Sequence, residues 1–268
     1  MILDATCHIS FSAEAPVAAI MMLRPRSGYA QWITREEYAF SPHAPVVEYA
    51  DYFGNLCQRV LIPKGQFDVR CSCRAHAADT IDVDPYAAMV PVHLLPESAL
   101  QFLLPSRFCQ SDMLHDFASS IVGGLPAGYP QVAAIEQWLR DKMKYVPGAS
   151  NEHTSAVETA NTKTGVCRDY AHLGVALTRS LNIPARMVVG YQYKLEPMDL
   201  HAWFEAFVGG RWFTFDGVQD QCCGNRIMIG YGRDAADVAL ASNYGVLQLN
   251  TMKVTVEEAP PGESHSSP

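Results

Sequence analysis

The chain has 268 residues, of which 49% are hydrophobic and 18% are charged, and its formal net charge is −8. This length fits one large domain or two modest ones, with enough apolar side chains for a sizeable core. The acidic balance and the lack of a basic cluster argue against nucleic-acid binding. We find no apolar stretch of about 18 residues that would span a membrane, and no signal peptide at the N-terminus. We therefore expect a cytoplasmic protein without a nucleic-acid or membrane partner.

Residues 1 to about 100 are predicted to form a chain of short strands. The candidate strands are 17–23, 31–40, 46–52, 56–62 and 67–75. Gly54-Asn55 gives a tight-turn signal, and Gly, Pro and Asn separate the other segments. Short strands with such boundaries favour an antiparallel sandwich or barrel. We predict an N-terminal β domain over 1–100, which offers no catalytic grouping of its own.

Helices dominate the prediction for the middle of the chain. Pro130 stands in the first turn of one helix, whose apolar stripe predicts packing against a core. A short helix around 156–161 precedes a longer one at 167–181. Together with the strands that follow, these helices define a predicted catalytic domain over 101–258. Residues 259–268 are rich in Pro, Gly, Ser and Glu, so we predict a disordered tail.

Cys167 stands where a turn becomes this longer helix. Gly165 provides a permissive backbone two residues earlier, and no proline interrupts the helical run that follows. In the first turn of a helix, unpaired backbone N–H groups and the helix dipole favour a thiolate over a thiol. The position therefore favours a nucleophilic cysteine, and the alternative is a buried and inert one.

Two strands joined by a tight turn are predicted downstream of this helix. A Gly-Gly pair is a two-residue hairpin signal between strands 199–208 and 211–216. Counting outward from that turn brings Trp203 opposite Asp216, so His201 is the diagonal neighbour of Asp216 on the same face. Diagonal pairs lie within reach of an imidazole and a carboxylate that lean together. A slip of one residue would place the two side chains on opposite faces.

Cys167, His201 and Asp216 form the set of side chains needed for nucleophilic acyl transfer. Cys167 would attack a carbonyl, and His201 would take the thiol proton and return it to the leaving amine. Asp216 would hold the imidazole in the productive tautomer and orientation. The alternative for each residue is structural: an inert cysteine, a half-buried strand histidine and a turn aspartate. The Cys167 backbone N–H is one candidate oxyanion donor; Asn161 is a candidate for the second, and a helix-end cap is its alternative.

Three segments of the sequence resemble the core motifs of the bacterial transglutaminase-like superfamily. They are Gly165-Val166-Cys167-Arg168-Asp169-Tyr170-Ala171-His172, His201-Ala202-Trp203-Phe204-Glu205 and Trp212-Phe213-Thr214-Phe215-Asp216. Segments 104–109 and 230–238 also resemble the entry to that family's core domain and its tail. The resemblance implies a papain-like α+β core, with the nucleophile on a helix packed on an antiparallel sheet, behind an N-terminal antiparallel β-sandwich. It also implies Cys167, His201 and Asp216 as the catalytic residues.

The resemblance further implies an activity, with one departure from the family pattern. Many members carry proline directly after the aspartate, whereas this chain has Gly217, which would loosen the strand end. The family suggests a cysteine protease or amidase acting on a peptide or protein substrate, and we expect neither metal nor other cofactor. Two alternatives stay open: a transglutaminase, in which an amine resolves the acyl-enzyme, and a non-enzymatic binding module on the same fold. The sequence does not indicate an oligomeric state.

The chain has eight cysteines, scattered along its length. Without a secretory signal, we expect them to stay reduced. Cys71-Ser72-Cys73 with His76 raises the hypothesis of a metal site, but no second ligand pair has zinc-finger spacing. We favour the alternative that Cys71 and Cys73 share the inward face of a strand.

Overall fold

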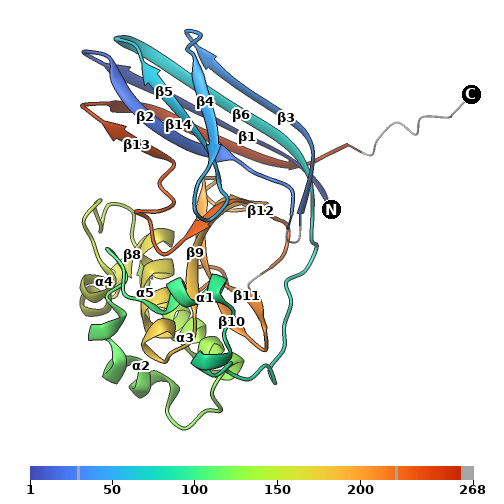
Figure 1. Ribbon diagram of the computed structural model, residues 1–268, viewed down its shortest axis with the longest axis vertical. Coiled ribbons are helices and arrows are strands. Elements are labelled where there is room, and N and C mark those ends of the chain that lie inside the picture. Colours follow the sequence, from blue (N-terminus) through green and yellow to red (C-terminus); the bar gives the residue numbers. More distant parts are fainter. Residues whose placement is uncertain (29–30, 221–222, 261–268) are drawn as a thin grey trace, which may run out of the picture.

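The computed structural model describes residues 1–28, 31–220 and 223–260, and it has two parts that lie end to end (Figure 1). One part is a sandwich of two antiparallel sheets. The other consists of helices packed on a four-stranded antiparallel sheet. The predicted α+β class, with a β-sandwich beside a helix-on-sheet core, is confirmed. Most of the predicted tail, residues 261–268, lies outside the described residues.

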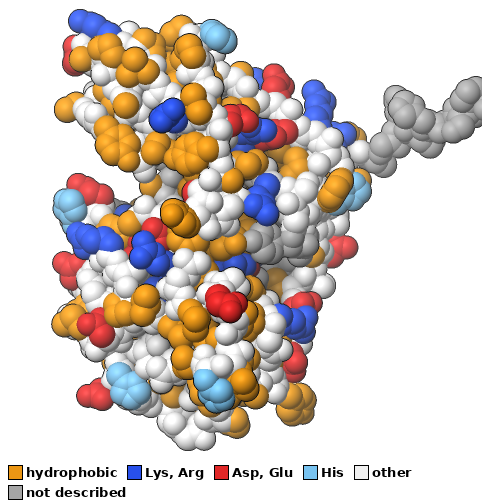
Figure 2. Space-filling model, in the orientation of Figure 1, with side chains coloured by type: hydrophobic (Ala, Val, Ile, Leu, Met, Phe, Trp, Pro, Cys, Tyr) orange, Lys and Arg blue, Asp and Glu red, His pale blue; other side chains and the backbone are white. Residues whose placement is uncertain are grey.

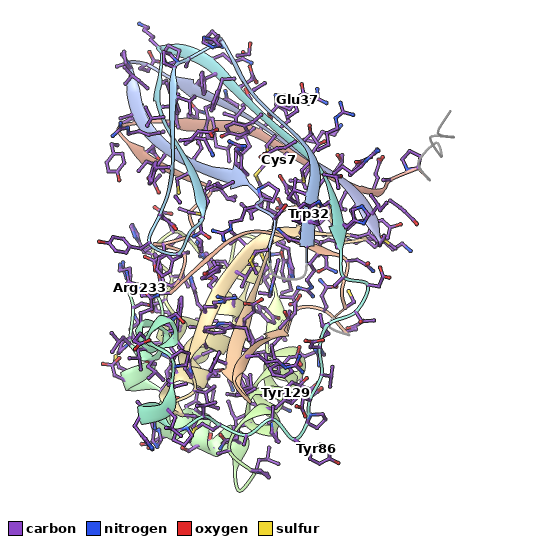
Figure 3. The ribbon with its side chains drawn as sticks, turned by 45° about the vertical axis from the view of Figure 1, so that its right-hand side comes forward. Cys7, Trp32, Glu37, Tyr86, Tyr129 and Arg233 are labelled. Atoms are coloured by element: carbon purple, nitrogen blue, oxygen red, sulfur yellow. The ribbon has the colours of Figure 1, made fainter. Side chains whose placement is uncertain are left out.

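Each sheet of the sandwich has four strands. The first has the order β14 (Gln248–Glu258), β1 (Ile2–Ala13), β6 (Gly65–Ala77) and β3 (Gln31–Ser41). The second has the order β13 (Ala241–Tyr244), β2 (Val17–Arg24), β5 (Leu56–Ile62) and β4 (Val46–Ala50). Because side chains alternate along a strand, Cys7 of β1 is buried inside the sandwich (Figure 3), as are Cys71 and Cys73 of β6. The predicted inward face of 71 and 73 is therefore confirmed, and His76 is exposed on the other face.

The last two strands of the chain belong to the sandwich and not to the core. β14 pairs with β1 from Leu3 opposite Glu258 to Ser12 opposite Gln248, and β13 pairs with β2. Segment 241–258, which the sequence assigned to the catalytic domain, thus adds the edge strands of both N-terminal sheets. Pairing between strands from opposite ends of a chain leaves no local sequence pattern, so the sequence could not predict that 241–258 joins the sandwich. The domain boundary near residue 100 stays a prediction.

The sandwich carries exposed apolar side chains. Figure 2 shows hydrophobic groups gathered over its strands, and those of the second sheet include Val47, Tyr49, Leu61 and Tyr244. Scattered apolar residues are normal on protein surfaces. Among the described residues, no helix is long and apolar enough to cross a membrane.

The core is built on the sheet that carries the candidate site. Its order is β11 (Arg211–Phe215), β10 (His201–Val208), β9 (Ala185–Gln192) and β12 (Arg226–Gly232). Around it lie η1 (Val92–Leu94), α1 (Glu97–Leu100), η2 (Gln101–Leu103), η3 (Ser111–Met113), α2 (His115–Val122), α3 (Tyr129–Lys142), α4 (Ala156–Thr162) and α5 (Cys167–Ser180), with the two-residue strands β7 (Lys144–Tyr145) and β8 (Thr164–Gly165). Tyr129 of α3 meets Phe213 of the sheet edge to face, with ring centroids 5.4 Å apart (Figure 3).

Helix α5 lies directly on strand β10 (Figure 1). Gly174 makes this approach feasible, because a Cβ at that position would lie 2.5 Å from Cε1 of the Phe204 ring. Almost every residue of α5 after its first turn is buried. The predicted helix 167–181 is therefore confirmed, and its first residue is held against the end of the sheet.

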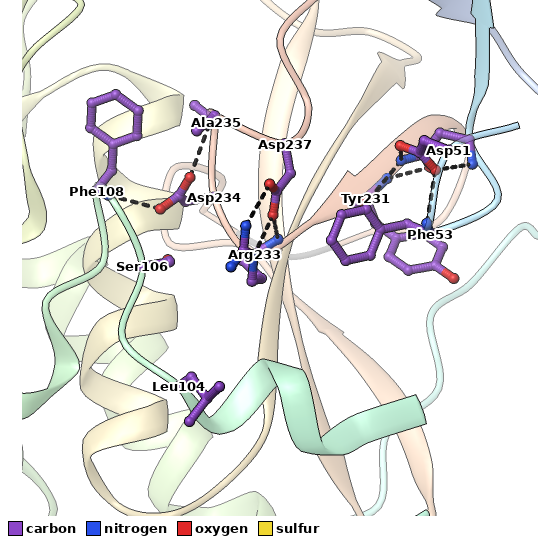
Figure 4. A network of polar contacts seen from close by, with 12 residues as sticks. Asp51, Phe53, Leu104, Ser106, Phe108, Tyr231, Arg233, Asp234, Ala235 and Asp237 are labelled. Carbon is purple, nitrogen blue, oxygen red and sulfur yellow. Dashed lines mark hydrogen bonds and ion pairs between the residues drawn. The ribbon is translucent and has the colours of Figure 1, made fainter. Parts of the chain in front are cut away.

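Two segments outside the helix, 104–109 and 230–238, help to hold α5 in place (Figure 4). Arg179 is buried and donates to the carbonyl oxygens of Leu104 at 3.0 Å and Arg233 at 2.7 Å. Asp234 accepts the backbone N–H of Phe108 at 2.8 Å. The segments 104–109 and 230–238, which resemble family motifs, thus clamp the helix from two directions.

His172 of α5 contacts both of these segments. It is fully buried, its ring stacks on that of Phe108 at 5.1 Å, and its Nε2 accepts the backbone N–H of Ala235 at 3.1 Å. Burial lowers the pKa of His172 to about 4. The residue is therefore a neutral group that packs against its neighbours and accepts a hydrogen bond, and we assign it no part in the chemistry of Cys167.

Candidate active site

Cys167 is the first residue of α5, and a tight hydrogen-bonded turn fixes it. The backbone N–H of Val166 donates to Oδ2 of Asp169 at 2.8 Å, and the N–H of Asp169 donates back to the Val166 carbonyl at 2.8 Å. Asp169 is fully buried, accepts the hydroxyl of Ser150 and pairs with Arg168 at 3.0 Å. The half-buried thiol therefore sits on a rigid helix start.

The strands that carry His201 and Asp216 form the predicted hairpin. Their register runs from Val208 opposite Arg211 to Phe204 opposite Phe215, which places Asp216 directly beyond the end of β11. The two turn glycines have φ angles of 58° and 84°, the positive values that a type I′ turn requires. His201 and Asp216 consequently lie on one face of the sheet, as the sequence predicts.

His201 and Asp216 are in direct contact. Nε2 of His201 lies 2.7 Å from Oδ2 of Asp216, and the side chains are 2% and 1% exposed. Gly217 does not loosen this end of the strand, contrary to expectation. It lies against α3, where a Cβ would come within 2.6 Å of Cβ of Leu139, and the N–H of Val218 closes the turn by donating to Oδ1 of Asp216 at 3.0 Å.

The third side chain, Cys167, lies near the imidazole. Burial lowers the pKa of His201, and Asp216 and the Cys167 side chain are both close enough to the ring to raise it. Because Nε2 is committed to the carboxylate, Nδ1 is the ring nitrogen left to serve the sulfur. Cys167 and His201 line one cavity of about 320 Å³, so the two side chains are accessible from the same side.

The comparisons with known proteins agree with this geometry. A family model described as the transglutaminase-like superfamily matches residues 115–217, which include Cys167, His201 and Asp216. The crystal structure of a proposed cysteine protease from Cytophaga hutchinsonii is 32% identical, with a TM-score of 0.90 over 98% of this chain and 92% of that one. The chain belongs to the transglutaminase-like superfamily.

Two further relatives of this transglutaminase-like chain are uncharacterised mycobacterial proteins. One, from Mycobacterium leprae, is 27% identical over 264 residues, which cover 91% of this chain and 93% of the relative. The other, from Mycobacterium tuberculosis, is 28% identical over 179 residues, or 58% of this chain and 55% of the relative. The likeness to the Mycobacterium leprae protein thus extends over both the sandwich and the core.

In this transglutaminase-like core, Asp216 is held by partners that the sequence did not reveal. Arg226 of β12 donates through Nη2 to Oδ2 of Asp216 at 2.8 Å. Glu136 of α3 accepts the backbone N–H of Asp216 at 2.8 Å, and Arg140, one turn further along α3, donates to its carbonyl at 3.3 Å. No spacing rule connects these residues with the hairpin, because they come from other elements that pack on it.

These contacts set the charges of the pair. Burial by itself raises the pKa of Asp216, but the Arg226 charge and the bond from His201 hold it well below its usual range. Burial likewise lowers the pKa of His201, yet hydrogen bonds to Asp216 and Cys167 outweigh burial and raise it to about 9. The site therefore favours an anionic carboxylate beside a protonated imidazole at neutral pH.

Trp203, two residues after His201, extends the site along the same face of β10. Its ring lies 6.1 Å from that of His201, and the Arg226 guanidinium lies over it at 5.0 Å. Trp203 lines a second cavity, of about 480 Å³, on the face of β10 opposite to Phe204. It therefore lies beside the imidazole and is not part of the cavity that contains Cys167.

The wall of the cavity at Cys167 contains further polar residues. The acidic side chains of Glu196, Asp199 and Asp220 line it, and no Lys or Arg does so among the described residues. Tyr145 of β7 also lines it. Asn161, the predicted candidate for a second oxyanion donor, is exposed on α4 and is not among the lining residues.

Proposed function

We propose that this chain is a cysteine-dependent acyltransferase that opens an amide bond through a thioester on Cys167. The observation that carries the proposal is the buried His201–Asp216 contact of 2.7 Å, made by a ring that lines the same cavity as Cys167. A helix-borne thiol, a histidine and an orienting carboxylate are the parts of a cysteine acyl-transfer site.

The geometry suggests one role for each group. Sγ of Cys167 would attack the carbonyl carbon, forming a C–S bond and a tetrahedral oxyanion. His201 would give its Nδ1 proton to the leaving amine as the C–N bond breaks, while Asp216 holds the ring through Nε2. In the second half, an acceptor would lose a proton to Nδ1 and attack the thioester, and the C–S bond would break with sulfur leaving as a thiolate beside the imidazolium.

We favour water as the acceptor, which makes the protein a peptidase or amidase. The similar protein from Cytophaga hutchinsonii is named as a proposed cysteine protease, and it matches this chain over nearly its whole length. The substrate would be a peptide or protein. Some of the residues that line the cavity, such as Glu196 and Asp220, are exposed to solvent, so a polymer chain could reach Cys167 from outside. In this reaction the bonds that form and break involve the Cys167 sulfur, the His201 proton, the substrate amide and water.

A transglutaminase is the second candidate, and one observation favours it. The acidic wall of the cavity, with Glu196, Asp199 and Asp220, would attract a positively charged lysine or other alkylammonium acceptor. A non-enzymatic binding module is the third class. It is disfavoured because a decayed site would have no reason to retain all three side-chain types.

One experiment separates these three classes. A glutamine-containing peptide is incubated with the protein, with and without a labelled primary amine, and products are identified by mass spectrometry. Cleavage or deamidation without incorporation of the amine supports hydrolysis, whereas a labelled adduct reverses the choice in favour of transamidation. Absence of any product that depends on Cys167, over a peptide library, supports the binding module.

We further propose a reducing compartment, the cytoplasm, as the site of action. Cys7 and Cys71 stand opposite each other on adjacent strands, and both are free thiols. Free buried cysteines are typical of proteins in reducing compartments. Cell fractionation with an antibody tests this placement, and recovery of the protein outside the cytoplasmic fraction would contradict it.

A further inference from the structure

Tyr145 stands beside the nucleophile although it is far from it in the sequence. The strands β7 and β8 pair in parallel, with Tyr145 opposite Gly165, and the N–H of Val146, directly after β7, donates to the Gly165 carbonyl at 3.0 Å. Gly165 precedes Cys167 by two residues. This pairing fixes the backbone of Tyr145 next to the start of α5, and its side chain lines the cavity of Cys167 and His201.

Burial raises the pKa of the Tyr145 hydroxyl, and the backbone N–H of Cys167 lies close enough to the hydroxyl oxygen to act against this effect. This N–H belongs to the first residue of the helix, so it has no acceptor within the helix. In an acyl transfer on Sγ, the same N–H is the donor nearest to the carbonyl oxygen that becomes negative. The hydroxyl oxygen therefore lies close to the place where the oxyanion would form.

The hydroxyl is also chemically suited to donate. Burial, and the negative charges of the Cys167 sulfur and of Asp199, raise the pKa of Tyr145, so its proton is retained at neutral pH. The side chain is 46% exposed, so it is free to turn by the small amount needed to share the N–H with a substrate oxygen. Its ring is 6.3 Å from that of the buried Tyr170, which supports one side of it.

We propose that Tyr145 supplies the second hydrogen-bond donor of the oxyanion hole, a role that rests on the acyl-transfer function proposed above. In the free protein its oxygen lies near the N–H of Cys167. As the C–S bond forms, this N–H and the Tyr145 O–H both donate to the new oxyanion. When the C–N bond breaks, the electron pair returns to the carbonyl, and both hydrogen bonds weaken without any transfer of the phenolic proton.

The test compares two reactions of the same sulfur in Tyr145→Phe. Acylation by p-nitrophenyl acetate passes through an oxyanion, and release of p-nitrophenolate in the first turnover measures it. Alkylation by iodoacetamide displaces iodide at a saturated carbon and forms no oxyanion. We expect acylation of Cys167 to fall about 10²-fold, in the range found for loss of one oxyanion donor. Alkylation of Cys167 should stay within about twofold of the wild-type rate, because this reaction requires only an accessible and activated thiol.

Tyr170→Phe is the matched control, since Tyr170 is buried behind Tyr145 and is not among the lining residues of the cavity. It should leave both rates within about twofold. Normal acylation in Tyr145→Phe would overturn the role of Tyr145 and leave the proposed function intact. A parallel loss of alkylation would also overturn it, because Tyr145 would then act on the thiol. If the wild-type protein shows no acylation that depends on Cys167, the proposed function itself fails.

Discussion

Arg226 and His201 donate hydrogen bonds to the same oxygen, Oδ2 of Asp216, at 2.8 Å and 2.7 Å. The Arg226 and Asp216 side chains are only 7% and 1% exposed, so the ion pair is shielded from solvent. Removing one partner of a buried pair leaves the other charge uncompensated, which costs more than the pair contributes.

We therefore expect Arg226→Met to lower the free energy of unfolding by about 3–5 kcal/mol. Urea denaturation of the single variants and of Arg226→Met combined with Asp216→Asn measures the coupling. The double variant should be less destabilised than the sum of the single variants, because it removes both charges together. Simple additivity would show that the two side chains do not depend on each other.

Asp216 should matter far more for catalysis than for binding of substrate. Its carboxylate holds Nε2 of His201, so its loss frees the ring to adopt other tautomers and orientations. We expect Asp216→Ala to lower kcat by up to about 10⁴-fold, as for a triad aspartate. A loss of less than tenfold, measured with a substrate found in the peptide screen, would remove Asp216 from the catalytic set.

The pH profile reports the proton on His201. The imidazolium must protonate the leaving amine, and the pKa of His201 is raised to about 9 by its bonds to Asp216 and Cys167 despite burial. We expect kcat/KM to fall as the pH rises through about 9, because the imidazolium then loses its proton. In Asp216→Asn the carboxylate charge that raises this pKa is absent, so the fall should occur at lower pH. A profile with the same alkaline limb in both proteins would contradict the assignment.

The stability of the core should depend on pH through His172. Burial lowers the pKa of His172 to about 4. Between about pH 6.5 and 4, His172 is therefore protonated in the unfolded chain and neutral in the folded protein. Stability contributed by the neutral ring is thus present at pH 7 and is lost as the pH falls through this window. His172→Gln, whose side-chain oxygen can accept the Ala235 N–H, should show a smaller fall in the urea midpoint over the same range. An equal fall in both proteins would contradict the role of His172.

Thiol labelling should single out Cys167 even though it is not the most exposed cysteine. Cys223 is exposed, whereas Cys167 is half-buried beside His201. Iodoacetamide should modify Cys167 faster than Cys223, as judged by peptide mass spectrometry, because a neighbouring histidine activates a cysteine as a nucleophile. His201→Ala should reduce the rate at Cys167 and leave the rate at Cys223 unchanged. Equal rates for the two sites in the wild-type protein would show that Cys167 is not activated.

The sequence was most informative where structure depends on neighbouring residues. A two-residue Gly-Gly turn fixes the register of β10 and β11, so the shared face of His201 and Asp216 followed from counting alone. The helix start at Cys167 was likewise local, because Gly165 precedes an uninterrupted run of helix-forming residues.

The remaining parts of the site depend on contacts between distant segments. Arg226 and Glu136 reach Asp216 from β12 and α3, and neither has a spacing that relates it to the hairpin. Tyr145 reaches the cavity only through the pairing of β7 with β8. For the same reason, the return of 241–258 to the sandwich was missed, since the edges of a sheet accept strands from any part of a chain.

The central claim is tested most directly by trapping the acyl-enzyme. The protein is exposed to a peptide library, quenched in acid and digested, and the fragment that contains Cys167 is examined by mass spectrometry. We predict a thioester adduct on Cys167 that is absent from Cys167→Ala and greatly reduced in His201→Ala. An adduct confined to Cys223, or undiminished at Cys167 without the imidazole, would contradict the account.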